Sequence, residues 1–172
     1  MQKIIKGLTL NLKLLFLTVG FSGLSPKASG TVGTIVSLPI GVYFLTILPP
    51  ASLFLFTILI TIFAIKIINI YEKETQTHDS KIIVIDELVG MWFALAISIT
   101  EKIEQFSTPI ILNIIFSFIY FRIFDIWKPS VIGKIDRDVK GGLGVMGDDI
   151  FAGIIAGLLS AVTVKLILAY LL

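Results

Sequence analysis

The chain has 172 residues, of which 56% are hydrophobic, with a mean hydropathy of +0.99 and a formal net charge of +2. So much apolar surface excludes an ordinary water-soluble domain of this size and indicates an integral membrane protein. The cations are interspersed with acids, which gives no nucleic-acid-binding stripe, and the absence of cysteine excludes disulfides, thiolate nucleophiles and Cys-based zinc sites.

The first predicted element is an amphipathic helix along the inner membrane surface. Its apolar residues recur at helical spacing among lysines, at Ile5, Leu8, Leu12, Leu15 and Val19. A signal peptide is the alternative, but the apolar run at residues 14–19 is short and no clear Ala-x-Ala cleavage pattern follows. The pattern therefore favours a surface helix.

Five apolar segments follow, at residues 35–48, 51–70, 88–100, 110–121 and 150–172, with an apolar lead-in at 82–85. Only the second and the last reach the roughly 20 residues that a full span needs, so the others must use flanking polar residues, tilt or lie partly buried. Pro49 and Pro50 predict a tight hairpin between the first two. The expected fold is an all-α, polytopic membrane bundle with about five membrane-embedded segments plus the N-terminal helix, forming one domain over residues 1–172.

The distribution of lysine and arginine predicts the orientation of the bundle. Cations cluster before the first segment, after the second and after the fourth, whereas the other two connections carry only Lys102. By the positive-inside rule the N-terminus is cytoplasmic and the C-terminus lies outside. Three polar segments, at residues 20–34, 71–87 and 122–149, then share the inner face. Because acids at the edge of hydrocarbon are costly without compensation, their convergence predicts a site for a positively charged ligand.

The first polar segment is rich in small and hydroxyl residues at positions 25–34 and leads into an apolar helix. Backbone N–H groups at that helix start, together with Lys27, Thr31 and Thr34, would suit a phosphate. Taken alone, an ordinary Ser/Thr helix cap is the simpler explanation of these residues.

The second polar segment carries Asp79, Asp86 and Glu87. Asp79 and Asp86 are seven residues apart and would share a helix face if the helix began early enough, while Glu87 would point about 100° away. Helix capping is the alternative. Capping explains one or two acids but not a pair that continues an apolar run, which favours a functional role. Gly90, one turn beyond Asp86, permits close approach by a neighbouring helix.

The third polar segment has the densest set of charged residues. Arg122 and Asp125 lie on one helix face at i, i+3, so an internal ion pair is the simplest interpretation. Asp148 and Asp149 are expected at the start of the last helix, where two adjacent acids exceed what one cap requires. The glycines before them are predicted to let the backbone wrap round a ligand, at Gly141, Gly142, Gly144 and Gly147. Gly153 and Gly157 indicate helix packing.

These residue types favour Mg²⁺ and a phosphorylated ligand. Hard oxygen ligands without cysteine or a histidine cluster favour Mg²⁺ over zinc or copper. Arg122, Lys128 and Lys140 lie beside the acids and would neutralise a phosphate. His78 is the only histidine, which excludes a phosphatase with one His as nucleophile and another as acid. Metal-assisted attack by water or by an aspartate is left, and the residues do not decide between them.

Two other functions also place acids in membrane proteins. A lipid phosphotransferase with CDP-linked donors would need an Asp-x-x-Asp-Gly-x-x-Ala-Arg pattern, which this sequence lacks. A small intramembrane cation-binding transporter would place its acids near the middle of the bilayer, whereas these acids lie at helix ends. Cation transport is therefore the alternative to phosphate-ester chemistry.

Three separated motifs, together with residues 26–33, resemble the phosphatidylglycerophosphatase A family over most of the chain. They are Ile85-Asp86-Glu87-Leu88-Val89-Gly90, Phe121-Arg122-Ile123-Phe124-Asp125-Ile126-Trp127-Lys128-Pro129, and Gly141-Gly142-Leu143-Gly144-Val145-Met146-Gly147-Asp148-Asp149. The sequence departs from the family pattern at Ser29 and Ser130, where the family commonly has Pro, and Pro or Trp, respectively. Both departures fall on loop shape and leave the acidic set intact.

The resemblance implies a Mg²⁺-dependent hydrolase in phosphatidylglycerol biosynthesis, which removes the terminal phosphate of phosphatidylglycerophosphate at the cytoplasmic face of the bacterial inner membrane. By the family pattern the acidic site residues are Asp79, Asp86, Glu87, Asp125, Asp148 and Asp149. All six are candidate metal ligands, and the last five are also candidate catalytic residues. The candidate substrate-binding residues are Lys27, Thr31, Thr34, Arg122, Lys128 and Lys140.

Overall fold

A computed structural model describes residues 11–77 and 80–171, and all regular structure within them is helical. Residues 11–17 are helical and are followed by the short helix η1 (Ser22–Leu24). The remaining helices are α2 (Ser29–Ile47), α3 (Pro50–Thr75), α4 (Ile85–Ser98), α5 (Thr108–Trp127), α6 (Val131–Asp138) and α7 (Gly142–Leu171). The prediction of an all-α bundle is confirmed.

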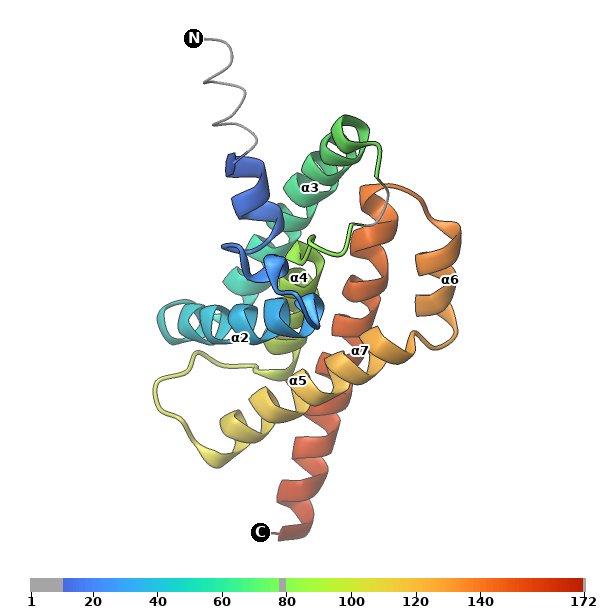
Figure 1. Cartoon of the computed structure of the whole chain (residues 1–172). Helices are drawn as coiled ribbons and strands as arrows, with labels where there is room; N and C mark the ends of the chain where they lie inside the picture. The colour runs from blue at the N-terminus through green and yellow to red at the C-terminus, as the bar shows by residue number, and fades with distance from the viewer. Residues whose placement is uncertain (1–10, 78–79, 172) are drawn as a thin grey trace.

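Helix α4 lies at the centre of the bundle (Figure 1), packed against α2, α3, α5 and α7. Its 14 residues extend only about 21 Å, less than the roughly 30 Å of membrane hydrocarbon, and nearly all of its side chains are buried. In the described part of the chain, the four helices around it are each long and apolar enough to cross a membrane. The expected count of about five embedded segments thus resolves into four candidate spans around one short, enclosed helix.

The outer faces of the spans are apolar. Leu55 and Phe63 on α3, Ile115 on α5 and Val162 on α7 are all exposed, although each is a large hydrophobic residue. An apolar exterior round a packed interior is expected where the surrounding solvent is lipid. The fold is therefore that of a membrane protein.

Several helices extend beyond their apolar segments into flanking polar residues. Helix α2 begins at Ser29 rather than at residue 35, and α5 continues through Trp127 rather than ending at residue 121. Continued helix satisfies the backbone hydrogen bonds of residues near the membrane edge without help from water. The predicted tight connection at the two prolines is confirmed, because only two residues separate the end of α2 from Pro50, where α3 begins. The two helices do not pack along their lengths as a hairpin, and each packs mainly on α4.

The condition under which Asp79 and Asp86 would share a helix face is not met, since residues 80–84 are not helical and α4 begins only at Ile85. The segment before it is held away from helical geometry by the N-terminal segment, as the Val84 N–H donates to the Leu17 carbonyl at 2.9 Å. His78 and Asp79 lie outside the described residues, as do Ile5 and Leu8 of the predicted amphipathic helix. Of its described members, Leu12 and Leu15 are exposed on the helix. The prediction is wrong for Val19, which lies beyond the helix end at residue 17 and takes a positive φ of 45°.

The glycine-rich stretch before the last apolar segment is not the predicted loop. Helix α7 begins at Gly142, so Gly144 and Gly147 lie within it, and Asp148 and Asp149 are in its second turn. Of the four glycines in this stretch, only Gly141 takes a positive φ, of 71°. The Gly142 backbone packs so closely on α3 that a Cβ there would lie 2.5 Å from the Ile65 carbonyl oxygen. These glycines allow close helix packing rather than a flexible wrap.

Close approach also explains Gly90 and Gly153, as the sequence predicts. A Cβ on Gly90 would lie 2.7 Å from the Asp149 carbonyl oxygen, and one on Gly153 would clash with the Gly90 carbonyl. The two glycines thus let the backbones of α4 and α7 touch. This contact sets Glu87 on α4 beside Asp149 on α7.

Candidate functional site

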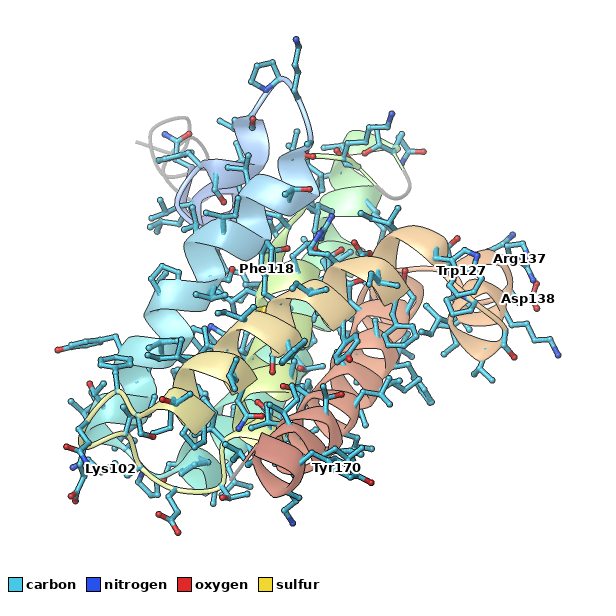
Figure 2. The ribbon with its side chains drawn as sticks, turned by 90° about the horizontal axis from the view of Figure 1, so that it is seen from below. Lys102, Phe118, Trp127, Arg137, Asp138 and Tyr170 are labelled. Atoms are coloured by element: carbon cyan, nitrogen blue, oxygen red, sulfur yellow. The ribbon has the colours of Figure 1, made fainter. Side chains whose placement is uncertain are left out.

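The polar ends of several helices enclose one cavity. The starts of α2, α4 and α7, the end of α5, and α6 surround a space of about 430 Å³, within the roughly 300–1,000 Å³ typical of small-molecule sites. Figure 2 shows Arg137 and Asp138 of α6 far from Lys102 and Tyr170, which lie at the opposite ends of the helices. The acids that line the cavity are Asp86, Glu87, Asp125, Asp136, Asp148 and Asp149. The cations are Lys81, Lys128, Arg137 and Lys140.

Three of the acids form a compact group, which we call the carboxylate triad: Glu87 from α4, Asp125 from α5 and Asp149 from α7. One carboxylate oxygen from each lies within 4.8 Å of the other two. Glu87 is 7% exposed and Asp149 only 3%, and the Oδ2 atom of Asp149 is buried without a hydrogen-bond partner. Buried carboxylates this close repel one another unless a cation compensates them. Three hard oxygen donors, one of them unpartnered, fit a divalent ion such as Mg²⁺.

Arg122 lies against the triad and pairs with two of its members. Its Nη1 is 2.6 Å from Glu87 Oε2 and 2.9 Å from Asp125 Oδ2. The simple interpretation of Arg122 and Asp125 as an internal ion pair is therefore confirmed, and the pair extends to Glu87. With the three carboxylates ionised, one guanidinium leaves a charge of about −2, which a single divalent cation would balance.

Thr31 and Thr34 hold this ion pair from the first turns of α2. Arg122 donates from Nη2 to the Thr31 hydroxyl at 3.1 Å and from Nη1 to the Thr34 hydroxyl at 3.0 Å. Thr34 is fully buried, and its Oγ1 lies 2.8 Å from Glu87 Oε2. Arg122 and the two threonines thus position the triad without lining the cavity themselves. Their contact with substrate remains a prediction, as does that of Lys27, which is exposed and also outside the cavity lining.

Lys128 links α5, α6 and α7 at the wall of the cavity. Its ammonium donates to Asp148 Oδ2 at 2.6 Å and also to Asp136. Burial lowers the pKa of Lys128, but the hydrogen bonds and charges of Asp136 and Asp148 outweigh that effect and raise it. The side chain therefore stays protonated. Of the predicted substrate-binding residues, Lys128 and Lys140 line the cavity.

Asp136 lines the cavity although it belongs to none of the three sequence motifs. It lies on α6 four residues after Ile132, whose side chain is buried against the protein. The i, i+4 spacing from a buried residue is the signal that would have placed Asp136 on the inner face of α6. Lys81 and Arg137 also line the cavity, although no motif in the sequence distinguishes them from the other cations of the polar segments. The position of Lys81 is fixed by its carbonyl, which accepts a hydrogen bond from the Ser29 hydroxyl at 2.7 Å.

Gly30 gives a test of how tightly Glu87 is placed. A Cβ at residue 30 would clash with Glu87 Oε1, while the other oxygen of Glu87 is held by Arg122 and Thr34. We expect Gly30→Ala to lower divalent-metal affinity by roughly 10- to 100-fold, because it displaces a ligand as the loss of a supporting partner does. Metal titration followed by thermal unfolding measures this, and unchanged affinity would show that Glu87 can move without consequence.

Comparison with known proteins gives one consistent family. The sequence profile described as Phosphatidylglycerophosphatase A matches residues 15–164. A phosphatidylglycerophosphatase A from Escherichia coli is 39% identical over 145 residues, which cover 83% of this chain and 79% of that protein. One from Haemophilus influenzae is 36% identical over 141 residues, covering 81% and 82% of the two chains. A protein from Bacteroides thetaiotaomicron, provisionally named a phosphatidylinositol-3-phosphatase, is 34% identical over 145 residues, covering 82% and 86%. No solved structure gives a significant match.

Proposed function

The chain belongs to the phosphatidylglycerophosphatase A family, and on that premise we propose that it hydrolyses phosphatidylglycerophosphate to phosphatidylglycerol and inorganic phosphate. The observation that carries the proposal is the carboxylate triad, which gathers acids from three helices into a cavity that also holds cations. Such a cavity suits a phosphomonoester bound through a metal and basic side chains.

Glu87, Asp125 and Asp149 would hold Mg²⁺. When bound there, Mg²⁺ would act as a Lewis acid that polarises a phosphate oxygen. The protein contributes the placement of the ligands: Arg122 and Thr34 fix Glu87, and Arg122 also pairs with Asp125. The contact between Gly90 and the Asp149 backbone keeps α4 and α7 together.

Lys128 and Asp86 are the other residues to which we assign roles. Lys128, kept protonated by its acidic partners, would neutralise charge on the phosphate. Asp86 lines the cavity outside the triad, and its Oδ1 accepts a hydrogen bond from the Glu87 N–H at 3.0 Å. It would either take the proton of an attacking water or attack phosphorus itself. In the first route Asp86 takes a proton from the attacking water as the bond from phosphorus to the glycerol oxygen breaks, and then passes that proton to the leaving oxygen. In the second route attack by Asp86 breaks the same bond and forms an aspartyl phosphate. A water that gives one proton to the leaving glycerol oxygen then hydrolyses the aspartyl phosphate, which releases inorganic phosphate and restores Asp86.

The Bacteroides relative supports a class of substrate. Phosphatidylglycerophosphate and a phosphatidylinositol 3-phosphate are both phospholipids whose headgroup carries a phosphomonoester and is itself joined to the lipid through a phosphodiester. We propose this shared chemistry as the substrate class. The lipid tails would remain in the bilayer, and the excess of cations near the polar helix ends supports a cavity facing the cytoplasm at a bacterial inner membrane.

Phosphate release from purified protein in detergent tests the function. With phosphatidylglycerophosphate and Mg²⁺ we expect steady release of phosphate, and with a chelator we expect loss of more than about 90% of it, restored by added Mg²⁺. Activity that is indifferent to chelation would contradict the role of the metal. Reconstituted protein that moves cations but releases no phosphate would instead favour the transporter.

A further inference from the structure

Three of the four cations lining the cavity have no ion-pair partner in the described part of the chain. Lys128 is held by Asp136 and Asp148, but Lys81, Arg137 and Lys140 are exposed at the mouth and form no salt bridge with a described acid. We call these three the rim cations. They come from the segment before α4, from α6 and from the turn between α6 and α7. Two stretches far apart in the sequence, at residue 81 and at residues 137–140, thus bring positive charge to one opening.

We infer that the rim cations bind the phosphodiester of the lipid headgroup, so that the cavity selects lipids that carry two phosphates. This inference rests on the proposed function. When the phosphomonoester of a substrate lies against the carboxylate triad, the rest of the bound molecule must extend out of the cavity in the direction of its acyl tails. In the substrate class proposed here, the phosphodiester lies between the phosphomonoester and the tails. The diester is therefore brought to the mouth, where the rim cations are.

The same geometry disfavours a lipid with a single phosphate. In phosphatidic acid the phosphomonoester is attached directly to diacylglycerol. Placing that phosphate at the triad would bring ester groups and the first part of the tails against three charged side chains. The rim cations would then lose hydration without gaining an anionic partner, which costs free energy. Lysine and arginine at the mouth thus act in specificity and in binding rather than in the chemical step.

The competing explanation is that the rim cations only attract an anionic bilayer surface. Lys134 provides a matched control, because it is an exposed cation on α6 that does not line the cavity. A general surface attraction would depend on Lys134 about as much as on its neighbours. Binding of a phosphodiester by the rim cations would not depend on Lys134. Soluble substrates remove the bilayer altogether and separate the two explanations further.

The test compares the double variant Arg137→Gln/Lys140→Gln with Lys134→Gln and the parent. The substrates are phosphatidylglycerophosphate in mixed micelles, its deacylated headgroup with both phosphates, and glycerol 3-phosphate with the monoester alone. For the double variant we expect kcat/KM on both two-phosphate substrates to fall at least about tenfold, through KM, relative to its value on glycerol 3-phosphate. We expect Lys134→Gln to match the parent, and Lys81→Gln to shift the same ratio in the same direction.

Equal losses on all three substrates would overturn the inference, as would a loss confined to micelles and shared by Lys134→Gln. Thermal unfolding of each variant confirms that the exposed substitutions leave the fold intact. A parent protein that releases phosphate from none of the substrates would reject the proposed function itself, and the inference with it. If the parent is active but the double variant keeps the parent's ratio of kcat/KM on the two-phosphate substrates to kcat/KM on glycerol 3-phosphate, the inference alone is rejected.

Discussion

Asp149→Asn is expected to abolish phosphate release and, in the absence of metal, to make the protein more stable. The Asp149 carboxylate is buried beside Glu87 and Asp125 and has an oxygen without a hydrogen-bond partner. Removing its charge relieves repulsion among the acids but also removes a metal ligand. The loss of activity should exceed the roughly 100-fold that the removal of a supporting outer partner costs at metal sites.

Thermal unfolding with and without Mg²⁺, beside the activity assay, measures both effects. The parent should gain stability as Mg²⁺ is added, because the metal binds the folded state, and Asp149→Asn should lose most of that gain. Asp138→Asn is the matched control, since Asp138 is exposed on α6 and does not line the cavity. An Asp149→Asn protein that stays active and keeps the Mg²⁺-dependent gain would remove Asp149 from the metal site.

Arg122→Gln is expected to destabilise the fold by about 3–5 kcal/mol, the usual cost of leaving buried charges without their partner. Arg122 is only 12% exposed and pairs with side chains of Glu87 and Asp125 that are 9% and 13% exposed. Without the guanidinium these two acids repel each other across the site. Added Mg²⁺ should recover part of the loss, because it supplies positive charge to the same carboxylates.

Arg122→Lys separates charge from geometry. The single ammonium of lysine keeps the positive charge. It cannot contact the acids and also donate the hydrogen bond that Arg122 makes to Thr31. Its unfolding temperature should fall between those of the parent and Arg122→Gln. If Arg122→Gln were as stable as the parent but raised KM strongly, the guanidinium would contact the substrate phosphate instead of supporting the triad.

The sequence is sufficient to predict the helical membrane fold and the convergence of its polar ends, because long apolar runs and cation counts report directly on membrane insertion. Its motifs also contain Asp86, Glu87, Asp125, Asp148 and Asp149 as candidate site residues, and all five line one cavity. Their roles remain predictions. A carboxylate beside an apolar run costs free energy of desolvation, so its presence there indicates a specific role. The sequence also predicts that Gly90 allows a neighbouring helix to pack closely, since a small residue on an apolar helix permits such contact.

The partners of each side chain depend on tertiary geometry that the pattern does not contain. Helix α7 begins at Gly142 because its glycines pack on backbone carbonyls, whereas glycine in a sequence equally indicates a loop. Thr31 and Thr34 look like helix caps or phosphate ligands, yet they bind Arg122 from a distant helix. Asp136 lines the cavity, but its pairing with Lys128, which reaches it from the end of α5, depends on how α5 and α6 pack.

If acids from α4, α5 and α7 share one divalent cation, a crystal structure with a bound metal ion will place that ion between them. Mn²⁺ can replace Mg²⁺ in a crystal and be located by its anomalous scattering. We predict a peak coordinated by one oxygen from each of Glu87, Asp125 and Asp149. A catalytically active protein whose Mn²⁺ binds elsewhere, with these three carboxylates metal-free, would contradict the account.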